Sequence, residues 1–114
     1  MPYLSIRTNV EPAPAAISDL LAALSRQTAA ALGKDERYVM VALDAGVPML
    51  FAGSGAPLAY AELKSIGLPQ RVEPLARMLC DQLAEHLGIP AERVYIEFTD
   101  APAERWGWNG GTFG

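Results

Sequence analysis

One pattern occurs twice in the chain, as Leu32-Gly33-Lys34-Asp35-Glu36-Arg37-Tyr38-Val39-Met40-Val41 and as Leu87-Gly88-Ile89-Pro90-Ala91-Glu92-Arg93-Val94-Tyr95-Ile96. In each copy a glycine follows an apolar stretch, a short charged turn comes next, and a run rich in β-branched and aromatic residues completes the pattern. Glycine in this place is typical of a helix end, and such a run is typical of a strand. The sequence therefore predicts one helix–turn–strand unit twice, and this repeat decides the fold class.

The residues upstream of each copy have the periodicity of an amphipathic helix. Apolar side chains recur at spacings of three and four over residues 15–32 and again over residues 70–87, which predicts two helices that each bury one face. Alternating patterns precede these helices, and apolar runs follow them. We therefore expect strands at residues 3–8, 38–43, 58–66 and 94–99, and a further short strand at residues 49–52 after a turn at Ala45-Gly46.

The order of these elements predicts an α/β (α+β) fold in a single domain over residues 1–114, with pseudo-repeats at about residues 2–52 and 57–100. Right-handed β-α-β crossovers place both helices on one face of a shared four-stranded mixed sheet. The other face has no helical layer, and we expect the chain to trimerise through it. The tail, residues 101–114, mixes aromatic residues with glycines and is predicted to form a hairpin or strand that packs on a neighbouring subunit.

Composition limits the classes of function. The 114 residues are 51% hydrophobic and carry a formal net charge of −4 at pH 7, which argues against a nucleic-acid partner and against an anionic membrane surface. The first residues lack the features of a signal peptide, so a cytoplasmic location is expected, and leaderless secretion stays open. One cysteine, Cys80, and one histidine, His86, exclude an intrachain disulfide and a His-rich zinc site. No metal and no cofactor are expected.

Pro2 is the residue that carries the clearest chemistry. A methionine before a small residue is commonly removed, and its removal would leave the secondary amine of Pro2 at the start of the chain. An α-amino group titrates near pH 8 in peptides, and an apolar pocket lowers its pKa further. A neutral amine near pH 7 suits the removal of a proton next to a carbonyl. The alternative, that Pro2 is an ordinary second residue, is favoured by position alone.

A set of motifs in a fixed order along the chain favours a catalytic role for Pro2 over this alternative. Pro2 stands directly before a strand, and it is followed in order by Asn9, Gly33-Lys34, Ser65-Ile66-Gly67, Arg93-Val94-Tyr95-Ile96, and Gly107-Trp108-Asn109 with Thr112-Phe113. Over essentially the whole chain this set resembles the macrophage migration inhibitory factor family, which includes D-dopachrome tautomerase and lies within the tautomerase superfamily. The resemblance implies a homotrimer with three active sites at subunit interfaces. It implies an isomerase that tautomerises phenylpyruvate-like α-keto acids, with dopachrome as a second candidate substrate.

The resemblance also implies roles for single residues. Pro2 is the acid and base, Lys34 meets the carboxylate or carbonyl oxygen of the substrate, and Tyr95 enters from the adjacent subunit. The residues expected to contact the substrate are Lys34, Ile66, Tyr95, Trp108, Phe113, Tyr3, Glu97 and Trp106. The simpler alternatives are a solvated lysine in a turn, a buried structural tyrosine, and aromatic rings that only pack.

Three positions depart from the family pattern. Glu97 stands where animal members carry asparagine, and its carboxylate would repel an anionic keto acid unless it turns away, is protonated, pairs with a cation, or the substrate differs. Trp106 replaces a smaller aliphatic residue and is expected to narrow and dry the mouth of the site. Residues 58–61 lack the Cys-x-x-Cys of the animal cytokine, which excludes thiol–disulfide chemistry. The alternative function is therefore a cytokine-like signalling or binding trimer with weak or no catalysis, for which a protein receptor is a candidate partner.

Overall fold

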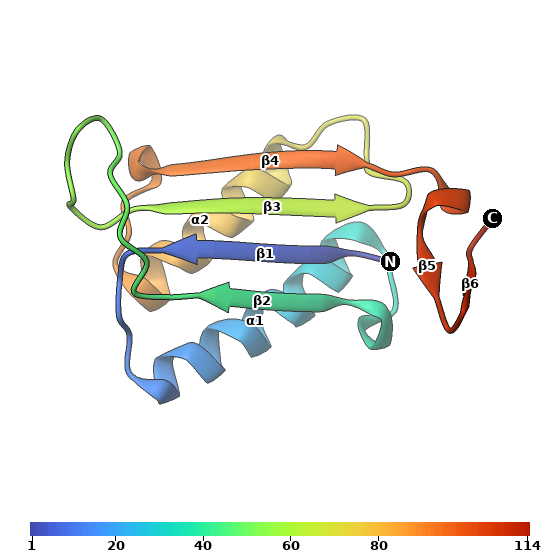
Figure 1. Ribbon diagram of the computed structural model, residues 1–114, viewed down its shortest axis with the longest axis horizontal. Coiled ribbons are helices and arrows are strands. Elements are labelled where there is room, and N and C mark those ends of the chain that lie inside the picture. Colours follow the sequence, from blue (N-terminus) through green and yellow to red (C-terminus); the bar gives the residue numbers. More distant parts are fainter.

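Two antiparallel strands form the centre of the sheet in the computed structural model, which describes residues 1–114. These are β1 (Tyr3–Thr8) and β3 (Ala59–Ser65). β2 (Met40–Asp44) pairs parallel to β1, and β4 (Val94–Asp100) pairs parallel to β3, so the strand order is β2-β1-β3-β4 (Figure 1). The mixed sheet and its two parallel β-α-β units confirm the predicted fold class.

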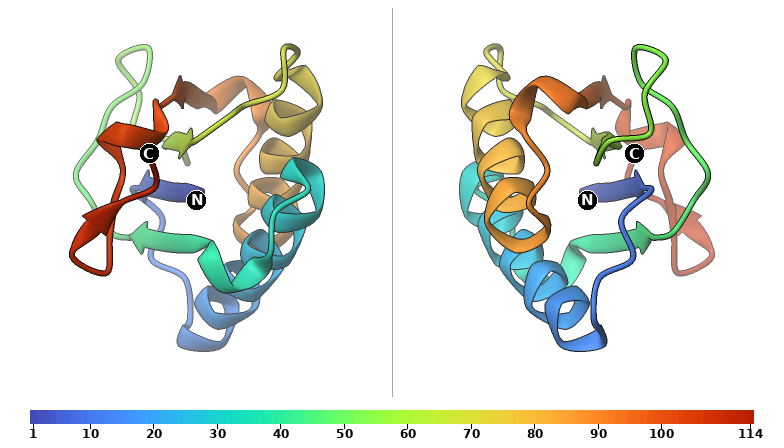
Figure 2. Two further views of the ribbon diagram at one scale, coloured as in Figure 1. Left: turned by 90° about the vertical axis from the view of Figure 1, so that its right-hand side faces the viewer. Right: turned by 90° about the vertical axis from the view of Figure 1, so that its left-hand side faces the viewer.

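Both long helices cover the same face of this sheet, as Figure 2 shows. α1 comprises Pro14–Leu32 and α2 comprises Glu73–Leu87. Each helix has a proline in its first turn and ends at a glycine in the left-handed conformation, Gly33 or Gly88, as the repeat predicts. The core between helices and sheet consists mainly of leucine and isoleucine, and its fully buried members include Leu4, Ile6, Leu20, Leu24, Leu63, Leu79, Leu83 and Ile89.

Two expected strands differ from the structure by more than one residue at an end, and the second helix, expected from residue 70, begins at Glu73. The strand expected at residues 38–43 begins at Met40, because Glu36–Tyr38 form a short 3₁₀ turn, η1, in which the backbone N–H of Arg37 donates to the Asp35 side chain. The strand expected at residues 49–52 is wrong. Phe51 and Ser54 form an isolated bridge, and Ala52 and Gly53 between them have φ of 53° and 71°. Two consecutive left-handed residues reverse the chain in a tight turn, so no strand can continue through them.

The other face of the sheet has no helix over it (Figure 2). Side chains at alternate positions point outward there, and Met40 and Tyr95 are 64% and 65% exposed. The tail forms the predicted hairpin from β5 (Gly107–Trp108) and β6 (Gly111–Thr112), and it lies beyond the end of the sheet where β1 begins (Figure 1). Its packing on a neighbouring subunit stays a prediction. None of the helices has the length and apolar character needed to cross a membrane.

Candidate active site

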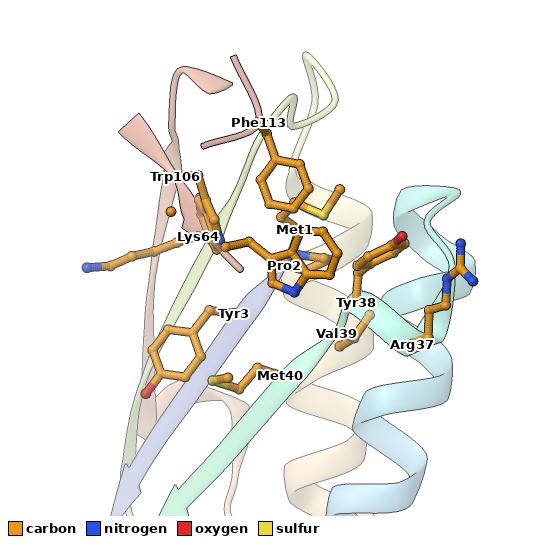
Figure 3. Close-up of a pocket in the computed structure, with 12 residues that line it drawn as sticks. Met1, Pro2, Tyr3, Arg37, Tyr38, Val39, Met40, Lys64, Trp106 and Phe113 are labelled. Carbon is orange, nitrogen blue, oxygen red and sulfur yellow. The ribbon is translucent and has the colours of Figure 1, made fainter. Parts of the chain in front are cut away.

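A cavity of about 460 Å³ opens at the end of the sheet where β1 begins. The first residues of the chain, η1 with the start of β2, and the C-terminal hairpin enclose it (Figure 3). The structure brings five of the predicted site residues together in its lining, which are Pro2, Tyr3, Trp106, Trp108 and Phe113. Segments from both ends of the chain therefore meet at one concave surface.

Pro2 is held firmly at the base of this cavity. Its residue is less than 2% exposed, and its carbonyl oxygen accepts a hydrogen bond from the backbone N–H of Met40 at 3.0 Å. This bond continues the β1–β2 ladder by one residue, so the ring nitrogen of Pro2 has a fixed place. Removal of Met1 would turn that nitrogen from an amide into the secondary amine of a residue that lines the cavity.

The surroundings favour the neutral form of an amine. Burial, together with the nearby Lys34 ammonium, lowers the pKa of the Met1 amino group below its ordinary value. Burial is the larger cause, because a charged amine loses hydration there, and a second positive charge adds repulsion. Pro2 is more deeply buried than Met1 and lines the same cavity.

The aromatic wall of the cavity is built on Tyr38. Its ring meets Trp108 edge-on with centroids 5.9 Å apart and Phe113 edge-on at 6.5 Å, and the Trp108 and Phe113 rings stack at 5.6 Å. These are favourable arrangements for aromatic pairs. The backbone N–H of Phe113 also donates to the carbonyl oxygen of Trp106 at 3.2 Å. The tail hairpin is thus attached to the rest of its own chain through a cluster of rings.

Lys34 and Ile66 lie next to this cavity and bind to each other. The Lys34 ammonium donates a hydrogen bond to the carbonyl oxygen of Ile66 at 3.0 Å. Neither residue belongs to the cavity lining, although the charge of Lys34 is felt at the Met1 amine. An ammonium group has three N–H donors, so two of those of Lys34 remain for another acceptor.

Tyr95 and Glu97 are the predicted site residues that the single chain keeps away from Pro2. Tyr95 packs on Phe51 with ring centroids 4.6 Å apart, beside a separate apolar cavity of about 440 Å³ that shares no residue with the first. The Glu97 carboxylate accepts a hydrogen bond from the Thr99 hydroxyl at 3.2 Å. A role for either residue at the Pro2 cavity therefore requires a second copy of the chain.

Seven lining residues were not among the predicted site residues, and these are Met1, Arg37, Tyr38, Val39, Met40, Lys64 and Gly107. Tyr38 and its neighbours lie in the turn that follows the Gly33-Lys34 motif. Their position in the sequence could therefore have indicated that they lie near the site. Lys64 has no such signal, because only the antiparallel register of β1 and β3 puts it opposite Tyr3.

Comparison with known proteins gives a consistent result over the full length. Residues 1–114 match the family model described as macrophage migration inhibitory factor (MIF). The macrophage migration inhibitory factor homolog of Brugia malayi is 43% identical, with 100% of both chains covered, and the macrophage migration inhibitory factor of Xenopus laevis is 41% identical, with 99% of each covered. The crystal structure of the macrophage migration inhibitory factor homologue from Prochlorococcus marinus superimposes with a TM-score of 0.92 at 46% identity, covering 98% of this chain and 99% of that one.

Proposed function

Because the chain belongs to the macrophage migration inhibitory factor family, within the tautomerase superfamily, we propose that it is a keto–enol tautomerase of phenylpyruvate-like α-keto acids. The observation that carries this proposal is the position of Pro2, buried at the base of an aromatic cavity. Burial in a site of this kind favours the neutral form of a terminal amine, which is the form that accepts a proton.

The proposed reaction needs one group that both takes and gives a proton. After removal of Met1, the nitrogen of Pro2 takes a proton from the carbon next to the substrate carbonyl, and an enolate forms. The protonated nitrogen then returns the proton to the enolate oxygen, which gives the enol. In the reverse direction the same nitrogen moves a proton from oxygen to carbon, so the enzyme ends each cycle unchanged.

Other residues in the cavity lining and beside it suit the binding of the substrate. The two unused N–H donors of Lys34 are available to a carboxylate or to the developing enolate oxygen, and a cation near that oxygen stabilises the negative charge. The carbonyl of Ile66 holds the Lys34 ammonium in place. The stacked rings of Trp108 and Phe113, with Trp106 and Tyr3, offer an apolar surface to the aryl group.

We also propose that the active form is a homotrimer in which Tyr95 and Glu97 reach the Pro2 cavity of a neighbour. Support comes from the helix-free sheet face, from the unpaired outer edges of β2 and β4, and from the exposed Tyr95 beside an apolar cavity. A surface of this kind is typical of a protein–protein contact.

An ultraviolet assay of phenylpyruvate enolisation tests the function directly. Pro2→Gly replaces the secondary amine of the fixed ring with a primary amine on a more mobile residue, and it should reduce kcat/KM by about 100-fold, the lower range for loss of a positioned acid–base group. Intact-mass measurement must show that Met1 is absent from both samples, since an amide nitrogen at position 2 cannot act as a base. Equal rates for wild type and Pro2→Gly would refute the proposal, and a purely binding or signalling function would survive the substitution.

A further inference from the structure

Lys64 lies at the edge of the Pro2 cavity, on the face of the sheet across which a neighbouring subunit is proposed to pack. It is a half-buried residue of β3 that lines the cavity. Its antiparallel register partner is Tyr3 on β1, so both side chains leave the sheet on the helix-free face. In Figure 3 its charged end extends away from Pro2, on the side of the cavity opposite to that of Arg37.

Lys64 has no ionic partner within its own chain. The ion pairs of the single chain join Arg7 to Asp44, Arg37 to Asp35, and Arg71 to Glu73. The chain itself contributes no aspartate or glutamate to the lining of this cavity. An acidic side chain that enters from a neighbour would therefore meet an ammonium group whose N–H donors are available.

Glu97 is an exposed carboxylate in an unfavourable place on the same face. It stands in register with Glu62 across β3 and β4, and like charges at such positions repel each other. The side-chain hydrogen bond that it accepts comes from the Thr99 hydroxyl at 3.2 Å. Thr99 is the register partner of Lys64, yet no ion pair joins Lys64 to Glu97 within the chain. A cation from another chain would offset the repulsion.

Among the cations around Pro2, Lys64 is the one without a partner. Arg37 already forms an ion pair at 3.3 Å with a carboxylate beside its own turn. Lys34 already donates to a backbone carbonyl oxygen at 3.0 Å and lies outside the lining, and its remaining donors are those proposed for the substrate. If Glu97 of a neighbour reaches this cavity, Lys64 is therefore the cation it would pair with.

We propose that the Glu97 carboxylate of one copy forms an ion pair with the Lys64 ammonium of the next copy at the edge of the Pro2 cavity. This pair gives the subunit contact a charge-assisted hydrogen bond. It also neutralises a carboxylate that would otherwise repel an anionic substrate. The inference rests on the proposed homotrimer, and its first test needs no substrate.

Mixed trimers of two charge-exchanged variants test the ion pair. Lys64→Glu gives a chain with an acid at both positions, and Glu97→Lys gives a chain with a lysine at both, so trimers of either kind alone bring like charges together at every contact. In a trimer of both kinds, two contacts bring opposite charges together. When the two chains, one of them isotopically labelled, are unfolded and refolded together, native mass spectrometry should find mixed trimers in about 10-fold excess over random assembly, because two contacts gain an ion pair at once. An ion pair within one chain would give no excess.

Two controls define random assembly and separate the ion pair from a general effect of charge. Labelled and unlabelled wild-type chains give the random ratio. Lys64→Glu mixed with Glu62→Lys carries the same net charges on the same face of the sheet, and it should assemble close to that ratio. Random assembly of the exchanged pair, or an equal excess with Glu62→Lys, would overturn the ion pair. A wild type that is not trimeric would overturn it together with the proposed homotrimer, and the enolisation assay would still decide the activity.

Kinetics test the consequence for the substrate. Lys64→Met leaves the neighbour's Glu97 without its cation, so the KM for phenylpyruvate should rise by about 10-fold through repulsion between two anions. Glu97→Gln added to Lys64→Met removes the carboxylate and should lower KM again, whereas damage to the fold at Lys64 would keep KM high in both. A KM that stays high in the double variant would overturn the role of the pair in the site. Inactivity of the wild type toward phenylpyruvate would overturn the proposed activity and leave the mixed trimers to decide the ion pair.

Discussion

Lys34 has two effects at the start of the chain. Its ammonium holds the Ile66 carbonyl at 3.0 Å, and its charge lowers the pKa of the Met1 amine, second in size to the effect of burial. A cation near the amine destabilises the protonated form, so the amine stays neutral down to a lower pH. In the trimmed protein the same charge would act on the nitrogen of Pro2 and extend the range of pH in which it is a base.

Lys34→Gln tests this electrostatic effect. Without the neighbouring charge the pKa of the Pro2 amine rises, so the acid limb of kcat/KM against pH should move to higher pH. Arg7→Gln serves as the matched control, because Arg7 lies outside the cavity lining and is not among the causes of the shift, so its removal should leave the acid limb at the same pH. An acid limb at the same pH in wild type and Lys34→Gln would show that Lys34 does not tune the amine.

The sequence indicates some of these residues more readily than others. Pro2 is recognisable because a proline after the first methionine can become a terminal amine, and Lys34 because it follows the glycine that ends a helix. Lys64 carries no comparable mark. Its neighbours along the strand, Glu62 and Ser65, resemble those of any half-exposed strand, and its place beside Tyr3 follows from pairing between segments about sixty residues apart.

At the scale of elements, the connection between β2 and β3, residues 45–58, is fixed by the side chain of Arg93, the last residue of the short 3₁₀ turn Ala91–Arg93 that precedes β4. The Arg93 guanidinium donates to the carbonyl oxygens of Phe51, Ser54, Ala56 and Pro57 at 2.8–3.2 Å. It also lies over the Phe51 ring, 5.3 Å from its centroid. Because Phe51 packs on Tyr95, Arg93 indirectly sets the place of the tyrosine that is proposed to serve a neighbouring subunit.

Arg93→Lys should loosen this connection, because a lysine has three donors on one atom and cannot reach four carbonyl groups spread around a planar fork. We expect the free energy of unfolding to fall by about 1–3 kcal/mol, and the amide protons of Phe51 and Ser54, which bond each other's carbonyls, to exchange faster. Arg71→Lys, at an exposed ion pair with Glu73, should change stability by less than about 1 kcal/mol. Unchanged exchange at Phe51 and Ser54 would show that Arg93 is not the anchor.

The elements with a regular period were predictable, and the irregular connection was not. The two helices and the four strands of the sheet follow from apolar spacing and from the glycines at the helix ends. The strand expected at residues 49–52 was wrong. The apolar run from Met49 to Ala52 is typical of a strand, but Ala52 adopts a left-handed backbone conformation, which alanine rarely does, so the residue type does not predict it. The four hydrogen bonds of the Arg93 side chain stabilise the turn that contains Ala52. Hydrogen bonds between residues so far apart in the chain cannot be predicted from the local sequence.

At the scale of the whole molecule, the proposed site is divided between copies of the chain. Pro2 and Tyr95 line separate cavities of one chain, so a trimer would have to bring them together. The molar mass in solution, measured by sedimentation equilibrium or light scattering, should be about three times that of the 12.2 kDa chain, or slightly less after loss of Met1.

Subunit mixing tests the division itself. Pro2→Gly and Tyr95→Ala should each be nearly inactive alone, and chains of the two kinds that are unfolded and refolded together should recover activity. Recovery is expected because a mixed trimer can contain a site with Pro2 from one chain and Tyr95 from another. Wild-type chains mixed with themselves control for losses in refolding. No recovery in trimers shown by mass to contain both kinds of chain would place Tyr95 outside the site.

The two β-α-β units share one architecture but differ in the residue that precedes their first strand. β1 and β3 are equivalent strands of the two β-α-β units, yet β1 is preceded by Pro2 whereas β3 is preceded by Leu58, whose nitrogen is acylated by Pro57. A polypeptide has one N-terminus. A chain with two β-α-β units therefore has only one terminal amine. In the proposed mechanism each chain therefore supplies a single terminal base, from its first half, and the second half supplies Tyr95 for the proposed subunit contact.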